Sequence, residues 1–380
     1  MMNHGKCSRR TQAVLADALM TMGPQFELKL VENALHEQSG VAPYPFRAGQ
    51  LVTRSMMANG RPPKPAKAKG ALLPRGTTAE DAFRLTVLQC KWHIAANIPA
   101  IVNARDVEGL HQMRVALRRL RVALTCFGGE FRNSTTEALR LRAKQISERL
   151  ALARDFDVFL DELFEPAATA NGAKEAFDVL RARAKSARRT AWEDAVTQVQ
   201  SPTFSAFLRE IGEMIDQRAS SDAPTARTHP NKGVIAFEMP AKDVAGRMLE
   251  YRLDQAKKHA RGLRVLTDEQ RHKLRITLKK LRYSAEFFAP LYSERAVRKF
   301  LKRLSRMQDV LGALNDVVRA RETLETLVSE GDGGPLASRA DLSFAAGIAY
   351  GWQLERAART GKAAVGYWKK FREARPFWNS

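Results

Sequence analysis

The stretch that decides the fold reads His111-Gln112-Met113-Arg114-Val115-Ala116-Leu117-Arg118-Arg119-Leu120-Arg121, and a second copy reads His272-Lys273-Leu274-Arg275-Ile276-Thr277-Leu278-Lys279-Lys280-Leu281-Arg282. The copies lie 161 residues apart (272 − 111 = 161), and the register continues downstream, where Leu150 corresponds to Leu311 and Asp155 to Asp316. An internal repeat of this length predicts two similar helical units packed about a pseudo-two-fold axis. We therefore expect the functional site where the two copies meet.

Each copy is predicted to be an amphipathic helix, because neither contains Gly or Pro and both are rich in Leu and in basic residues. At 3.6 residues per turn, the apolar side chains share one arc and most basic ones share a neighbouring arc. Arg119 stands apart from this arrangement. Each helix therefore offers an apolar stripe for a core and, beside it, a column of cations. The two columns are His111, Arg114, Arg118 and Arg121, and His272, Arg275, Lys279 and Arg282.

The columns are predicted to bind an anion. A charged run on a single helix is usually its solvated face, and like charges at this spacing repel by about a few tenths of a kcal/mol per pair. Here the columns carry almost no carboxylate, only Glu286 at the far end, and the same pattern occurs twice. Arginine at many of these positions suits bidentate binding of phosphate oxygens.

Further residues are assigned to the same site by their place in the repeat. The remaining basic residues of the two helices, and basic residues downstream, are expected to face the same space: Arg119, Lys280, Arg142, Lys144, Arg303 and Arg306. Asp155 and Asp316 are expected where one helix ends and the next begins, so they are predicted to cap a helix or to hold a guanidinium of the columns. His111 and His272 either contact the anion or fix the helices by hydrogen bonds.

These residues resemble the CHAD domain, a helical domain named for its histidines. The resemblance rests on His-x-x-Arg followed by closely spaced basic residues in each half. It continues with Arg154-Asp155-Phe156-Asp157-Val158 and with Gln308-Asp309-Val310-Leu311-Gly312-Ala313-Leu314-Asn315-Asp316, and it covers about residues 75–370. It implies an all-α fold of two antiparallel four-helix bundles around a basic central pore, which binds inorganic polyphosphate without catalysis in the domain itself. Residues 219–237 are polar and contain proline, which predicts a connecting loop between a first bundle, 75–218, and a second, 238–380.

Residues 1–74 are predicted to form an N-terminal arm and a linker. Residues 25–30 alternate polar and apolar as a strand does, and they resemble the opening strand of the CYTH domain, a triphosphate-handling tunnel fold. That family opens with Glu-x-Glu-x-Lys, whereas Gln25 stands here before Glu27 and Lys29, and the segment is too short for the whole fold. We interpret it as a remnant or a chance match, with an edge strand or a disordered arm as the simpler alternative. Residues 61–74, rich in Pro and Lys, predict an extended, self-repelling tether.

Composition limits the classes of function. A net charge of +22 attracts polyanions, whether nucleic acid, anionic membrane or polyphosphate. The three cysteines have no paired spacing, so no disulfide framework is expected. No apolar run long enough to span a membrane and no signal-peptide pattern is present, so the expected location is the cytoplasm.

The motifs of catalysis are missing from the sequence. It contains no glycine-rich phosphate loop, and neither histidine has partners at metal-ligand spacing, so no cofactor and no metal are expected. The predicted function is non-enzymatic binding of inorganic polyphosphate, with location on polyphosphate granules. Nucleic-acid binding is the alternative, but the columns carry one aromatic residue, Tyr283, and no side chain suited to base readout. Oligomeric state is left open.

Overall fold

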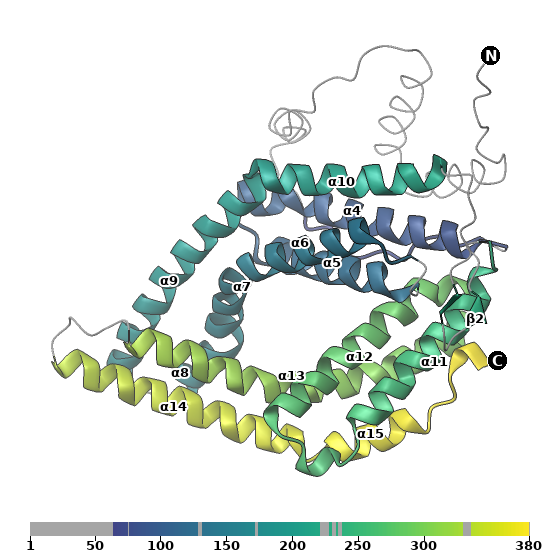
Figure 1. Ribbon diagram of the computed structural model, residues 1–380. Coiled ribbons are helices and arrows are strands. Elements are labelled where there is room, and N and C mark those ends of the chain that lie inside the picture. Colours follow the sequence, from purple (N-terminus) through teal and green to yellow (C-terminus); the bar gives the residue numbers. More distant parts are fainter. Residues whose placement is uncertain are drawn as a thin grey trace.

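The computed structural model describes residues 64–379 except 75, 128–130, 172–173, 221–227, 230–232, 235–237 and 330–335. The predicted N-terminal strand and its likeness to the CYTH domain lie outside these residues. The described part is almost entirely helical, as the sequence predicts (Figure 1). The β-structure within it is one antiparallel pair of two-residue strands, Thr228–His229 and Gly233–Val234, and one isolated bridge between Thr78 and Pro240.

The first half of the chain contains one long series of helices. Its α-helices are α4 (Ala79–Ala104), α5 (Val107–Cys126), α6 (Ser134–Arg149), α7 (Ala151–Val158), α8 (Glu165–Asn171), α9 (Lys174–Gln200) and α10 (Pro202–Ser220). Thr78 caps α4, since its side chain accepts a hydrogen bond from the backbone N–H of Asp81. Between α7 and α8 the chain forms a π-helical turn, η1 (Phe159–Phe164), which the sequence did not indicate.

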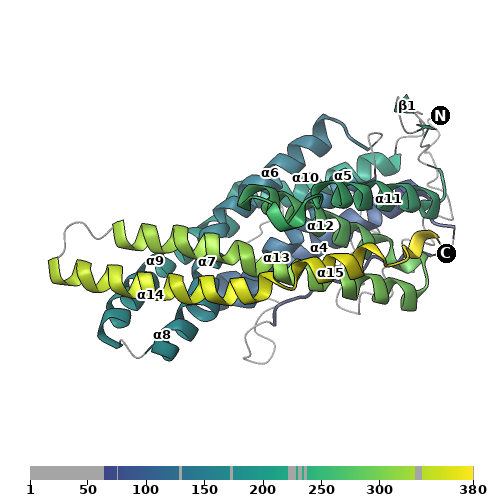
Figure 2. The same cartoon turned by 90° about the horizontal axis from the view of Figure 1, so that it is seen from below.

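The second half contains a similar series of helices, in which one long helix stands at the repeat positions of α6, α7 and η1. Its α-helices are α11 (Ala241–His259), α12 (Asp268–Phe288), α13 (Glu294–Ser329), α14 (Leu336–Gly361) and α15 (Ala364–Arg372), with 3-10 turns at η2 (Leu263–Val265), η3 (Ala289–Leu291) and η4 (Phe377–Asn379). Figure 2 shows α14 and α15 following one another along one face of the molecule. None of the described helices is apolar over a length sufficient to cross a membrane.

The repeat is visible in the helix boundaries. Equivalent helices begin at nearly one offset: 162 residues for α4 and α11 (241 − 79), 161 for α5 and α12 (268 − 107) and 162 for α9 and α14 (336 − 174). The two members of each of these three pairs also pack against each other. Contacts between equivalent elements are typical of a two-fold arrangement. The division into two four-helix bundles stays a prediction, because α14 packs on α8 and α9 of the first half as well as on α13.

Equivalent residues hold the two halves together at their joint. The rings of Phe127 and Phe288, which correspond in the repeat, meet edge to face with centroids 5.1 Å apart. The backbone N–H of Ala79 donates to the carbonyl of Met239 (2.8 Å), and the N–H of Ala241 donates to that of Thr77 (2.9 Å). The apolar stripes of α5 and α12 are buried, so the cation columns beside them lie at the edge of the core.

Two expected helix breaks are wrong. Asp316 lies inside α13, which runs without interruption from residue 294 to 329, and Asp155 lies inside α7. Neither residue therefore caps a helix. Gly312, four residues before Asp316, costs a helix only about 1 kcal/mol relative to Ala, and the packing of α13 outweighs that preference. In the first half the corresponding region does break, at Leu150.

The prediction of a self-repelling tether is wrong for residues 64–74, which are docked on α4. The backbone N–H of Ala66 donates to Oδ1 of Asn97 (3.1 Å), and its carbonyl accepts from Nδ2 of the same residue (3.0 Å). Ala71 and Leu73 are buried in the core. The amide of Asn97 and these two apolar side chains offset the repulsion among the linker cations. The C-terminal aromatic residues also pack inward, with Trp368 and Phe371 of α15 buried.

Candidate polyanion-binding site

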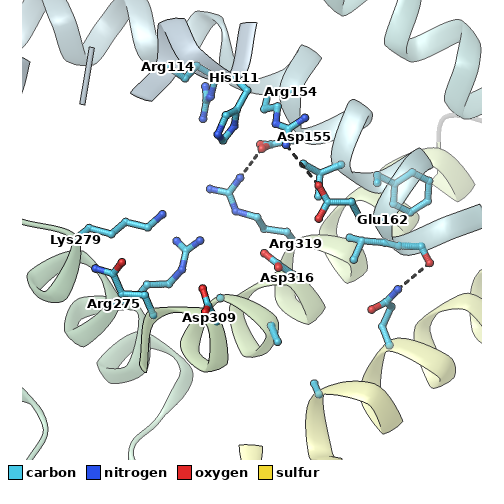
Figure 3. Close-up of a pocket in the computed structure, with 18 of the residues that line it drawn as sticks. His111, Arg114, Arg154, Asp155, Glu162, Arg275, Lys279, Asp309, Asp316 and Arg319 are labelled. Atoms are coloured by element: carbon cyan, nitrogen blue, oxygen red, sulfur yellow. Dashed lines mark hydrogen bonds and ion pairs between the residues drawn. The ribbon is translucent and has the colours of Figure 1, made fainter. Parts of the chain in front are cut away.

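A cavity of about 570 Å³ lies where the two repeat helices, α5 and α12, face α7, η1, α13 and α14 (Figure 3). Eight of its lining residues are Arg or Lys and four are Asp or Glu, so its charge is positive in balance. The cations are Arg114, Arg118, Arg154, Arg275, Lys279, Arg282, Arg319 and Arg356, and the carboxylates are Asp155, Glu162, Asp309 and Asp316. His111 also lines this cavity.

The cavity brings together both predicted columns. Arg114 and Arg118 enter from α5, and Arg275, Lys279 and Arg282 enter from α12. The local cause is the helical spacing, which places each set on the side of its helix next to the apolar stripe. Residues that are 161 positions apart in the chain therefore point into one space, as expected where two repeat units meet.

Arg114 is the most buried of these cations, with 9% of its surface exposed. Its Nη1 donates to the carbonyl oxygen of Ser147 on α6 at 2.5 Å, which fixes the direction of the guanidinium. Burial lowers the pKa of Arg114 to about 10, Asp155 opposes the shift, and Arg118 adds to it. The residue still carries a full charge at neutral pH, and it holds that charge in a poorly solvated place.

Lys279 is the most strongly perturbed group in the cavity. Burial first, and then the neighbouring charges of Arg118, Arg275 and Arg319, lower its pKa from 10.5 to about 6, while Asp316 opposes the shift. The same causes, burial first, lower the pKa of Arg275. The buried Nε of Arg275 has no hydrogen-bond partner among the described residues. The cavity therefore contains more buried positive charge and more unused donors than its own carboxylates satisfy.

The cavity carboxylates lie close to arginine side chains and do not cap helix ends. Asp155 accepts a hydrogen bond from Nη1 of Arg319 at 2.5 Å, which joins α7 to α13 across the cavity wall (Figure 3). Asp316 is partly buried, which raises its pKa, while Arg275 and Arg319 act in the opposite direction. One of the two predicted roles, holding a guanidinium, is therefore the geometry observed for Asp155. The guanidinium belongs to Arg319 and not to the columns.

Several predicted site residues do not line the cavity. Arg119 is buried between α5 and α12, where it pairs with Glu286 and lies over the rings of Tyr283 and Phe287. Nδ1 of His272 is within 2.8 Å of Oδ1 of Asn315, which favours the hydrogen-bonding role for this histidine. The other residues outside the cavity are Arg121, Arg142, Lys144, Lys280, Arg303 and Arg306.

Two of these residues are paired with carboxylates away from the cavity. Arg142 pairs with Glu210 of α10, and Lys144 lies 3.5 Å from Glu148 on its own helix. Burial first lowers the pKa values of Arg121 and Lys280; Arg140 then lowers that of Arg121, and Arg252 and Arg121 lower that of Lys280. They form a separate basic group beside the joint of α5 and α12.

Three cavity arginines were absent from the predicted set. Arg154 and Arg319 lie on α7 and α13, and Arg356 comes from α14, where its Nη1 donates to the carbonyl of Glu162 in the π-helical turn (3.2 Å). A sequence signal existed for two of them: Arg154 opens a motif of the family resemblance, and Arg319 follows Asp316 and Gly312 at helical spacing. Within the described residues, no group of three or more His, Cys, Asp or Glu is arranged to hold a metal ion.

Comparisons with known proteins agree with this architecture. The family model of the CHAD domain matches residues 87–325, more than half of the chain. The crystal structure of the CHAD domain from the plant Ricinus communis has a TM-score of 0.66 and 27% identity, and the alignment covers 80% of this chain and 96% of that one. PptA from Streptomyces chartreusis has a TM-score of 0.56 at 15% identity, over 77% and 99% of the two chains, and shows the fold alone. The comparison with curated proteins gave no match. The chain belongs to the CHAD domain family.

Proposed function

We propose that this protein binds inorganic polyphosphate in the cavity between α5 and α12. The observation that carries the proposal is the convergence of both cation columns on one cavity, where burial lowers the pKa values of Arg114, Arg275 and Lys279. An anion that enters this space removes the cost of keeping these cations desolvated and close together. A phosphate chain supplies several acceptors per unit length, which suits the forked donors of arginine.

Nucleic acid fits the cavity less well. Its lining contains one aromatic residue, Phe159, whereas single-stranded nucleic acid is held by stacking of successive bases on aromatic side chains. Tyr283, the aromatic residue of the columns, lies under Arg119 and is buried. Bases would also occupy room that a bare phosphate chain leaves free. Binding without catalysis and location on polyphosphate granules are parts of the same proposal.

Long-chain polyphosphate is expected to bind much more tightly than single-stranded DNA of equal charge at physiological salt. Competition between the two for the purified protein, followed by fluorescence anisotropy, measures the preference. The same samples with added Mg²⁺ are expected to return polyphosphate of unchanged length on a gel. Equal affinity for both polymers would favour the nucleic-acid function, and shortened chains would indicate catalysis.

Polyphosphate affinity is expected to fall as the pH rises above about 6. The pKa of Lys279 is about 6 in the free protein, and a bound polyanion raises it, so binding takes up a proton between the free and the bound pKa. Over that range the affinity decreases by up to about tenfold per pH unit. Below pH 6 Lys279 is charged in both states and contributes no further slope. Titrations from pH 6 to 9 measure the effect.

The control for this prediction is Lys279→Arg, which keeps a charge across the range and should lose the Lys279 part of the slope. His111 also has a lowered pKa, first through burial and then through Arg154, and it stays in both proteins, so the difference between native and Lys279→Arg isolates the Lys279 part of the slope. An unchanged slope in Lys279→Arg would show that another group takes up the proton.

A further inference from the structure

A second cavity, of about 490 Å³, is lined entirely by residues of the second half of the chain. Its walls are the end of α11, the turn η2 and the helix α15, and Figure 1 shows the chain between α11 and α12 passing beside α15. It shares no lining residue with the cavity between the repeat helices. Its volume is within the range of roughly 300–1,000 Å³ that is typical of ligand pockets.

Cations surround this second cavity, and none of its lining residues is acidic. The cations are Lys257, Arg261, Arg264 and Arg372. Nζ of Lys257 lies 3.2 Å from Oδ1 of Asp254, so its charge already has a partner. In the part of the chain that the structure describes, no ion pair is made by any of the three arginines. Their guanidinium groups are therefore available to an acidic ligand.

Helix dipoles do not account for all of these charges. Basic residues in the last turn of a helix offset its partial negative charge, which explains Lys257 at the end of α11 and Arg372 at the end of α15. Arg261 and Arg264 lie beyond the end of α11. Gly262, with a left-handed φ of 69°, reverses the chain between them, and the N–H of Val265 donates to its carbonyl at 2.9 Å. The turn itself presents the two arginines at the cavity.

Apolar side chains accompany the cations. Val265 is 82% exposed at the tip of the turn, and Val365 and Trp368 form the wall on α15. An apolar side chain that stays in water gains nothing for folding, and apolar surface rimmed by polar residues is typical of an interaction site. A bare phosphate chain would satisfy the arginines and leave Val265 in water. A ligand that suits both carries anionic groups next to an apolar group, as an acidic peptide with one apolar side chain does.

We propose that this cavity docks an acidic peptide segment of a partner protein. Its carboxylates pair with Arg261, Arg264 and Arg372, and one apolar side chain packs against Val265 and Val365. Arginine clusters are a recurring means of binding acidic motifs, and complementary charge gives such contacts their specificity. A partner held here leaves the polyphosphate cavity open, so the protein can join that partner to polyphosphate.

The probe for this site is a fluorescein-labelled nine-residue peptide of alternating Asp and Glu around one central Leu, with a second peptide carrying Ser in place of Leu. Anisotropy titrations compare the native chain with the triple variant Arg261→Ser, Arg264→Ser, Arg372→Ser. The variant is expected to bind the Leu peptide at least about tenfold more weakly, since several charge-assisted hydrogen bonds are lost. Its affinity for long-chain polyphosphate is expected to stay within about twofold of native, which separates this site from the proposed function.

The matched control removes the same charge from exposed residues outside both cavities, as Lys185→Ser, Arg189→Ser, Arg295→Ser. It should change peptide affinity by less than about twofold, and Val265→Ser should abolish the preference for the Leu peptide. Equal losses in both triple variants, or equal binding of the two peptides by the native chain, would overturn the proposal. Sedimentation with phosphatidylserine vesicles that depends on the three arginines, without peptide binding, would assign the surface to lipid instead.

Discussion

Replacing Arg114, Arg118, Arg275 and Lys279 together by Ala is expected to weaken long-chain polyphosphate binding by more than about a hundredfold at physiological salt. The four residues line one cavity, two from each repeat helix. Hydrogen bonds to charged groups contribute roughly 1.5–3 kcal/mol each, so the loss of even two of them suffices. The slope of log K against log salt should also flatten by roughly 0.7 for each lost phosphate contact. Titrations at several salt concentrations measure both effects.

The control for this variant removes the same number of basic side chains at exposed positions away from both cavities: Lys185, Arg189, Arg295 and Lys299. The cations of the linker are a poorer choice, because Nζ of Lys69 lies 5.6 Å from the centre of the Trp92 ring and so takes part in packing. If both quadruple variants lose affinity equally, binding depends on overall charge, and the cavity is not the site. Circular dichroism of each variant checks that its helices are intact.

The substitution Glu286→Ala is expected to lower the free energy of unfolding by about 3–5 kcal/mol. This is the cost of removing one partner of a buried ion pair while the other partner stays buried. Arg119 is 5% exposed and pairs with Glu286 across the joint of α5 and α12, and its guanidinium lies 4.9 Å from the ring centre of Phe287. Without Glu286 this charge stays in the core without a counter-charge. Denaturant unfolding followed by circular dichroism measures the loss.

Two comparisons distinguish a buried pair from an ordinary surface one. The double variant Arg119→Met, Glu286→Leu should be much more stable than Glu286→Ala, since apolar side chains of similar size often replace a buried pair without loss. Glu294→Ala breaks the exposed pair with Arg298 and should cost less than about 1 kcal/mol. A cost for Glu286→Ala as small as that for Glu294→Ala would mean that water reaches Arg119 after the substitution.

Arg119 also illustrates how far helical periodicity predicts a site. Its place on α5 already stands apart from the column, yet its charge suggested a role in anion binding. In the structure the two repeat helices pack closely enough that Glu286 and two aromatic rings of α12 enclose it. Equivalent residues differ in the same way: Arg282 lines the cavity, and its counterpart Arg121 does not. The repeat register is a property of sequence, whereas the direction of a side chain depends on the helices around it.

The amino-acid sequence by itself determined the helical fold, the repeat at one offset and four cations that line one cavity, Arg114, Arg118, Arg275 and Lys279. Periodicity, helix propensity and the order of charges act between residues that are close in the chain, so they can be recognised without coordinates. The tertiary structure alone decided that α13 runs unbroken, that the linker docks on Asn97 and that Arg356 reaches the cavity from α14. Each of these depends on contacts between residues far apart in the chain, and their free energies outweigh the local preferences from which the sequence was interpreted.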